Sequence, residues 1–178
     1  LQKAMPGESL KNYLPNGGEG ALLIACDVAR KLHQSPIQKS NSFLTIEERL
    51  SYIDRGWNIP ADHLQRARIF KEEVLKVSTV KVLLHGDLHH DNIVSDGKDW
   101  LVIDPKGVIG CPINEVWAFV QDLDKDLPII AKEFGFDIKM LAKCYYTHAV
   151  LAACWSVEDN LDPGSFLKLA DEAKQVLF

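Results

Sequence analysis

The 178-residue sequence predicts an α+β fold that is mostly helical, with one small β-hairpin near its middle. Apolar residues recur at helical spacing through most segments on both sides of the hairpin. The hairpin is indicated by Asp96-Gly97 between two apolar runs, because Asp-Gly suits the tight turns that join paired strands. A polar run from His85 to Asn92 stands directly before these strands and carries most of the chemical information.

Apolar periodicity and capping signals together predict the order of the elements. Ser9, Thr45 with Glu48, and Ser165 stand where side-chain oxygens accept the first free amides of a helix. Helices are therefore expected over residues 10–14, 19–34, 46–56, 61–77, 112–121, 137–158 and 165–178, and strands over 80–84, 93–94 and 100–103.

The composition fits one ordinary globular domain. A net charge of −5 disfavours nucleic acid as a partner and suits a cationic substrate. A membrane span is not expected, because no stretch reaches the ~18 consecutive apolar residues that one needs. The cysteines contain no C-x-x-C pair and are expected to be buried free thiols in the cytoplasm; they are Cys26, Cys111, Cys144 and Cys154.

Three residues in the polar region have the spacing of a phosphoryl-transfer site. Asp87 precedes Asn92 by five residues, and Asp104 ends an apolar run twelve residues later. Hard oxygen ligands such as Asn and Asp hold Mg²⁺ against nucleotide phosphates. A separate carboxylate must orient an acceptor hydroxyl and take up its proton. Asp87 is therefore the candidate base, and Asn92 and Asp104 are the candidate metal ligands.

Neighbouring polar residues have less certain roles. His85 is expected to be structural, with its imidazole bonded to the loop backbone. His89 and His90 are expected at exposed loop positions, and His89 is a candidate for the acceptor pocket. Lys106 has two readings of equal weight, a phosphate contact or an ion pair with a nearby carboxylate.

These motifs resemble those of the aminoglycoside phosphotransferase superfamily. The loop reads H-G-D-x-x-x-x-N, where protein kinases usually have H-R-D, so Gly86 argues against a protein kinase. The I-D-P-K-G segment at 103–107 is similar to the branch that contains streptomycin 6-kinases and hydroxyurea phosphotransferases. Residues 1–10 resemble its inter-lobe hinge, and residues 149–160 resemble a late helix with a W-x-x-E-D pattern.

The resemblance implies the large, C-terminal lobe of a protein-kinase-like fold, in which a small hairpin carries the catalytic loop. Residues 1–8 would be a hinge remnant and residues 9–178 the lobe itself. The small nucleotide-binding lobe would precede residue 1, so we expect the isolated chain to be a poor catalyst. The hinge would face ATP through backbone groups of Leu1, Gln2, Lys3 and Ala4.

Four more residues take candidate roles from the resemblance. Glu115 would brace the catalytic loop, unless it is a surface helix residue. Trp155, Glu158 and Asp159 would shape the acceptor pocket, with a core tryptophan and a solvated helix end as the equally weighted alternative.

The leading functional hypothesis is Mg²⁺·ATP-dependent phosphorylation of a small-molecule hydroxyl, on an aminoglycoside-type antibiotic such as streptomycin or on hydroxyurea. ATP and Mg²⁺ are the expected cofactors, and the acceptor and the oligomeric state stay open. One alternative is a metal-dependent hydrolase that uses His85, Asp87, His89 and His90 as zinc-type ligands. Another is a kinase-like lobe that binds a ligand without turnover.

Overall fold

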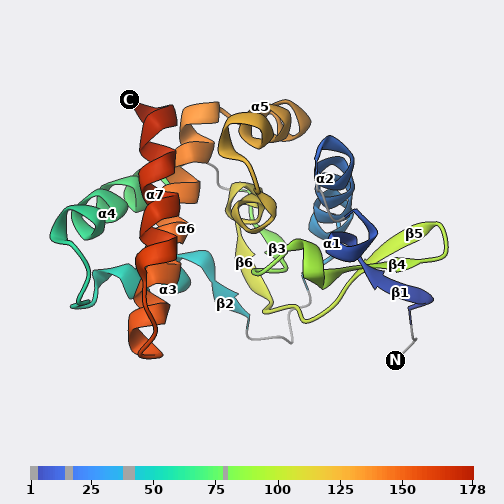
Figure 1. Ribbon diagram of the computed structural model, residues 1–178, viewed down its shortest axis with the longest axis horizontal. Coiled ribbons are helices and arrows are strands. Elements are labelled where there is room, and N and C mark those ends of the chain that lie inside the picture. Colours follow the sequence, from blue (N-terminus) through green and yellow to red (C-terminus); the bar gives the residue numbers. More distant parts are fainter. Residues whose placement is uncertain (1–3, 15–17, 38–42, 78–79) are drawn as a thin grey trace.

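The computed structural model describes residues 4–14, 18–37, 43–77 and 80–178, and it has helices packed beside two small sheets (Figure 1). The α-helices are α1 (Leu10–Tyr13), α2 (Glu19–His33), α3 (Ile46–Leu50), α4 (Ala61–Leu75), α5 (Leu123–Phe134), α6 (Ile138–Glu158) and α7 (Gly164–Leu177). The 3-10 turns are η1 (Ser51–Asp54), η2 (His90–Asn92), η3 (Pro112–Asn114) and η4 (Val116–Phe119). No described helix is long and apolar enough to cross a membrane.

The first sheet contains the predicted hairpin, with strand order β1-β4-β5. β4 (Ile93–Asp96) and β5 (Asp99–Val102) pair antiparallel, and the pairing of Asp96 with Asp99 leaves a two-residue turn. Gly97 adopts a φ of +65° in this turn, which a side chain would disfavour. β1 (Pro6–Ser9) adds a third, antiparallel strand that the sequence pattern did not predict.

The second sheet has strand order β2-β6-β3. β3 (Val82–Leu84) lies within the predicted strand over 80–84, whereas β2 (Leu44–Thr45) and β6 (Val108–Gly110) were not predicted. Strands of two or three residues are too short to show an alternating pattern. β3 leads into the polar loop and β6 follows the Asp104 segment, so this sheet holds both parts of the candidate site together.

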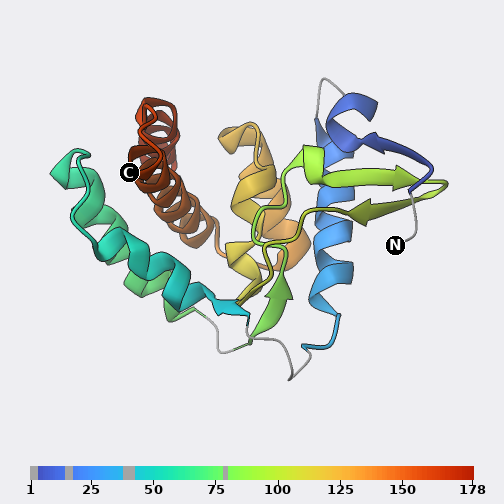
Figure 2. The ribbon, with the colours of Figure 1, turned by 90° about the horizontal axis from the view of Figure 1, so that it is seen from below.

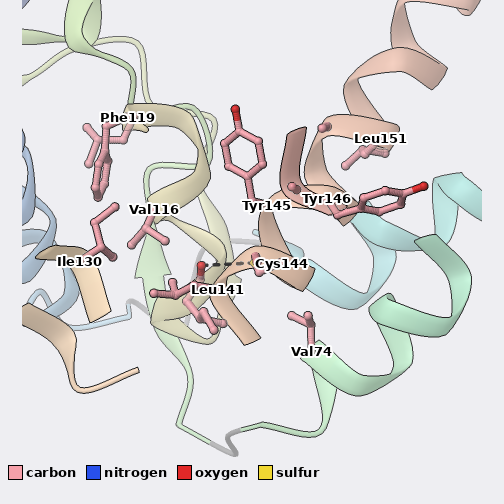
Figure 3. Close-up of a cluster of buried hydrophobic side chains, with 14 of the residues drawn as sticks. Val74, Val116, Phe119, Ile130, Leu141, Cys144, Tyr145, Tyr146 and Leu151 are labelled. Atoms are coloured by element: carbon pink, nitrogen blue, oxygen red, sulfur yellow. Dashed lines mark hydrogen bonds between the residues drawn. The ribbon is translucent and has the colours of Figure 1, made fainter. Parts of the chain in front are cut away.

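α6 is the centre of the helical half of the molecule. It packs against α4, α5 and α7, and most of its side chains are buried, which explains why apolar residues surround it on several sides. Figure 3 shows Tyr145, Tyr146 and Leu151 of α6 in the core, with Val74 of α4 nearby. The Cys144 thiol donates to the Ile113 carbonyl at 3.3 Å, which links α6 to the turns after β6.

Several helices match the predicted segments, and two of the predicted caps are confirmed. The Ser9 hydroxyl accepts from the Asn12 amide at 3.3 Å, and Thr45 with Glu48 forms a complete capping box. The helix expected over 46–56 instead continues after Leu50 as a 3-10 turn.

Three details of the prediction are wrong. Residues 112–121 form two 3-10 turns instead of one helix, because four consecutive residues, 113–116, are buried and a regular helix would turn some of them outward. Ser165 lies inside α7, where no side-chain cap is present, and Asp162 accepts the Gly164 amide at 3.0 Å. The sequence reading also missed α5, whose interior contains Pro128.

The two halves of the molecule meet at the polar loop. Figure 2 shows the β4–β5 hairpin beside α2 at one end, and α4, α6 and α7 at the other. The loop of residues 85–92 and the turns η3 and η4 lie between them.

Replacing Leu151 by alanine should lower the free energy of unfolding by about 2–5 kcal/mol, because the fully buried side chain leaves a cavity. Urea denaturation measures this change. Leu161, which is 64% exposed, is the matched control, and its replacement by alanine should change the free energy by less than about 0.5 kcal/mol. Equal losses in both variants would contradict the assigned core.

The pH dependence of stability should include His148. Burial lowers the pKa of this imidazole to about 3, whereas its value in the unfolded chain is about 6.5. The unfolded state therefore binds a proton first, and stability present above pH ~6.5 is lost as the pH falls towards 3. In His148→Gln, the loss between pH 6.5 and 5 should be smaller by about 1.5 kcal/mol, measured by urea denaturation. An unchanged pH slope would contradict the assignment.

Candidate active site

A buried carboxylate holds the start of the polar loop. Glu115, 1% exposed, accepts the backbone amide of His85 at 2.5 Å through Oε2 and that of Gly86 at 3.0 Å through Oε1. The imidazole of His33 lies 3.7 Å from Oε2. Both carboxylate oxygens are thus used by the two amides that precede Asp87. The bonds position the backbone from which the Asp87 side chain projects.

His85 joins the loop to the segment that carries Asp104. Its Nε2 lies 2.8 Å from the Ile103 carbonyl oxygen. A carbonyl oxygen only accepts, so Nε2 carries the proton and donates this hydrogen bond. Its own carbonyl accepts the amides of Lys106 and Gly107 at 2.8 and 3.2 Å. Three contacts on one residue therefore keep the two motifs adjacent.

Asn92 is 7% exposed and bonded within the same loop. Its Nδ2 donates to the Asp87 carbonyl at 2.9 Å and lies 3.1 Å from His89 Nε2. Its backbone carbonyl accepts the Ile103 amide at 3.0 Å, one residue before Asp104. Because the amide nitrogen is used internally, the side-chain oxygen is the group that Asn92 offers to a cation.

Asp104 is exposed and adopts a positive φ of 55°, which is uncommon outside glycine. Lys106 Nζ donates to its carboxylate at 2.6 Å and lies 4.0 Å from the Asp87 carboxylate. The hydrogen bond with Lys106 holds the pKa of Asp104 below its usual value, and the same bond raises the pKa of Lys106. At neutral pH one ammonium group therefore lies beside two carboxylates.

A cavity of about 590 Å³ opens beside Asp87. Four separate parts of the chain form its wall. They are the region of β2 and α3, the polar loop at Asp87 together with Lys106, η4, and the α6–α7 region. The lining residues are Leu44, Arg49, Asp87, Lys106, Trp117, Ala152, Trp155, Ser156, Asp159, Leu161 and Phe166. This size and mixture of aromatic, apolar and charged groups suit a small organic ligand.

A second cavity, of about 470 Å³, lies between the N-terminal ends of α2 and α5. His90 lines it, but Asp87, Asn92 and Asp104 do not. His90, predicted as exposed, is 6% exposed, because its Nδ1 lies 2.7 Å from Gln121 Nε2 and the ring packs into the interior. This cavity is therefore separate from the candidate catalytic groups.

The zinc-type cluster of the hydrolase hypothesis is not assembled. Among the residues that the structure describes, no three His, Cys, Asp or Glu side chains are placed to hold a metal together. The ring of His85 faces a carbonyl and that of His90 faces an amide, so the two rings serve as packing groups. This result does not exclude a Mg²⁺ site made by one Asp, one Asn and phosphate oxygens, because such a site does not need three His, Cys, Asp or Glu side chains.

The remaining predicted pocket residues divide into two groups. Trp155 and Asp159 line the 590 Å³ cavity, whereas His89 and Glu158 are not among its lining residues. The interaction of Glu158 with the Tyr52 hydroxyl raises the pKa of Tyr52. His89 lies 3.9 Å from the Asp87 carboxylate.

The hinge prediction is only partly covered by the structure. Leu1, Gln2 and Lys3 lie outside the described residues. Ala4 precedes β1, and its neighbour Met5 is bonded to the β4–β5 turn through the Gly97 amide at 2.7 Å.

The sequence reading missed Arg49, Trp117 and Phe166 as cavity residues. Arg49 stands 38 positions before Asp87, and no spacing pattern connects them. The capping box at Thr45 showed a helix but not the direction in which it faces.

The sequence is similar to those of known antibiotic resistance kinases. The sequence model of the aminoglycoside/hydroxyurea antibiotic resistance kinase family matches residues 1–160. Streptomycin 3''-kinase of Klebsiella pneumoniae is 26% identical over an alignment 159 residues long, and the match covers 79% of this chain and 59% of that protein. The chain thus spans less than two thirds of this curated relative.

A solved structure shows the same fold. The crystal structure of a choline/ethanolamine kinase family protein from Mesorhizobium loti superposes with a TM-score of 0.69, at 14% sequence identity. The match covers 95% of this chain and 64% of that one. At this identity the likeness establishes the architecture alone, and it confirms the expected kinase-like fold.

Replacing Glu115 by alanine should destabilise the start of the polar loop. The buried amides of His85 and Gly86 would lose their acceptor, and each unpaired buried group costs about 1–3 kcal/mol. We expect faster hydrogen exchange at these two amides and a lower free energy of unfolding. Glu172→Ala, on the surface of α7, is the control and should change the free energy by less than about 1 kcal/mol. Unchanged exchange at both amides would contradict the role.

Proposed function

Since the chain belongs to the aminoglycoside/hydroxyurea antibiotic resistance kinase family, we propose that it carries the acceptor side of an ATP-dependent small-molecule kinase. The observation that carries the proposal is the position of Asp87. Its half-buried carboxylate lines a ligand-sized cavity, and its loop is bonded to the segment of Asp104. A base at a cavity wall beside candidate metal ligands is the arrangement that phosphoryl transfer requires.

In this proposal Asp87 orients the acceptor hydroxyl and receives its proton as the oxygen bonds to phosphorus. The loop contacts of Glu115 and Asn92 would keep the carboxylate in place, so that the rate comes mainly from positioning and electrostatics. His85 would support the loop, as its three contacts suggest.

Asn92 and Asp104 would hold Mg²⁺ on the phosphates of ATP. Both offer hard oxygen atoms, and Asp104 is an exposed anion at neutral pH, so the donor chemistry fits this metal. Bound Mg²⁺ would neutralise phosphate charge. Lys106, which is bonded to Asp104 in the structure, would bind a phosphate oxygen in place of this carboxylate when ATP is present. Both roles considered for Lys106, an ion pair and a phosphate contact, would then apply.

The acceptor is proposed to be an aminoglycoside-type molecule, with streptomycin as the first one to test and hydroxyurea as the second. Trp117 and Trp155 provide aromatic faces in the cavity, and Asp159 provides a carboxylate for a cationic group. The net charge of −5 favours the approach of such a ligand. The four cysteines are buried and free, consistent with a reducing compartment such as the cytoplasm.

Thermal denaturation in the presence of ATP tests this function. We expect ATP to raise the midpoint of unfolding only when Mg²⁺ is present, and Asp104→Asn to remove the effect because the metal loses its carboxylate. Asp87→Asn should retain the shift. Relative to the slow streptomycin-dependent ADP formation that we expect of the unaltered chain, the same variant should lower the rate by at least about 10²-fold, since the proton acceptor is lost.

Asp99→Asn, at the exposed start of β5, is the matched control and should behave as the unaltered chain. A shift that does not require Mg²⁺, or that survives in Asp104→Asn, would remove the metal-nucleotide site. Normal ADP formation in Asp87→Asn would exclude Asp87 as the base.

A further inference from the structure

Arg49 lines the cavity from α3, a short helix that its N-terminal cap and two buried side chains hold in place. The capping box of Thr45 and Glu48 starts α3, with the Glu48 amide 3.2 Å from the Thr45 hydroxyl. Ile46 and Leu50, 3% and 0% exposed, pack this helix against the core. Arg49 therefore projects from a fixed helix into the cavity that Asp87 lines.

The guanidinium group of Arg49 is stacked on an aromatic ring, and among the described residues it has no hydrogen-bond partner. Its central carbon lies 4.9 Å from the centre of the Trp155 ring, a favourable cation–π distance. Throughout the described ranges Arg49 donates no side-chain hydrogen bond, and its buried Nε has no partner. Guanidinium donors point outward in the plane of the group, so stacking leaves their edges available to a ligand.

The charges of two carboxylates oppose the effect of burial on this group. Burial lowers the pKa of Arg49, while the charges of Asp87 and Glu115 act in the opposite direction. Both oxygens of Glu115 already accept backbone amides. Asp87 is thus close enough to act on the charge of Arg49, and within the described ranges the donors of Arg49 stay available to a ligand.

Gly86 allows this close approach. A Cβ atom at residue 86 would lie 2.8 Å from Arg49 Nη1 and 2.9 Å from Val108 Cγ2, and Gly86 has a φ of +83°. A side chain at this position would therefore displace the guanidinium. Arg49 lies directly against the backbone that precedes Asp87, with Lys106 also in the wall of the cavity.

We propose that Arg49 binds the phosphoryl group on the acceptor side of Asp87, both during transfer and on the phosphorylated product. The proposal rests on the proposed kinase function. In the transfer, the acceptor oxygen bonds to the γ-phosphorus and its proton passes to Asp87. The bond from phosphorus to the β,γ-bridging oxygen breaks, and ADP leaves with that electron pair. Arg49 donates hydrogen bonds to non-bridging oxygens of the transferred group, whose planar geometry suits a guanidinium.

Inorganic phosphate is the probe for this site, and tryptophan fluorescence is the readout, because Arg49 stacks on Trp155. Titration of the chain with phosphate should give a saturable signal that disappears in Trp155→Phe. Arg49→Met should weaken phosphate binding about tenfold or more, as expected for lost charged hydrogen bonds. Arg49→Lys should restore part of the affinity, since it keeps the charge but not the planar fork.

Arg55→Met is the matched control, because Arg55 is exposed and stacks on Tyr52 outside the cavity. It should bind phosphate as the unaltered chain does. Circular dichroism and urea denaturation establish that each variant is folded. With streptomycin as acceptor, Arg49→Met should lower kcat while changing KM less than about twofold, because the contact forms with the transferring group.

Absence of a saturable phosphate signal in the unaltered chain would overturn the proposal, as would equal phosphate affinity in Arg49→Met. A rise in KM alone would also overturn it, because Arg49 would then be an acceptor contact. The Mg²⁺·ATP shift depends on Asp104 and not on this cavity, so it separates the two proposals. If it fails while phosphate binding still requires Arg49, the kinase function falls and an anion site remains.

Discussion

The arrangement of the candidate site depends on one buried carboxylate. Glu115 accepts the amides of His85 and Gly86 and is almost fully enclosed. A buried charge is costly unless hydrogen bonds satisfy it, so the loop and the carboxylate require each other. The 3-10 turns around Glu115 follow from the same constraint, because they let several consecutive side chains face inward. The position of Asp87 is a consequence of this contact.

From this anchor the two sides of the site separate along the two small sheets. β4 and β5 follow the polar loop and lead to Asp104. β3 precedes the loop, and β6, which pairs with β3, follows the Asp104 segment. His85 bridges them through its ring and its carbonyl. Groups suited to a metal and nucleotide therefore lie at the hairpin, and the ligand-sized cavity lies towards the helices. Asp87 lines this cavity and is also bonded to Asn92 through its backbone carbonyl.

The cavity is built by segments far apart in the sequence. α3 supplies Arg49, η4 supplies Trp117, and the end of α6 supplies Trp155 and Asp159. Packing of α6 against α4 and α7 determines how these walls are spaced. If the proposed function holds, acceptor specificity would depend on this helix packing more than on the loop motif. The same loop motif could then serve different acceptors on one fold.

The sequence alone determined the helical class, the Asp-Gly hairpin, the capping box at Thr45, and the spacing that singles out Asp87, Asn92 and Asp104. These features are local, because each depends on neighbouring residues or a short periodicity. Only the tertiary structure decided the short strands β2 and β6, the burial of His90, and the approach of Arg49 to Gly86. Each of these arises from contacts between distant segments, and side-chain direction and burial at such contacts leave no periodic signal in the chain.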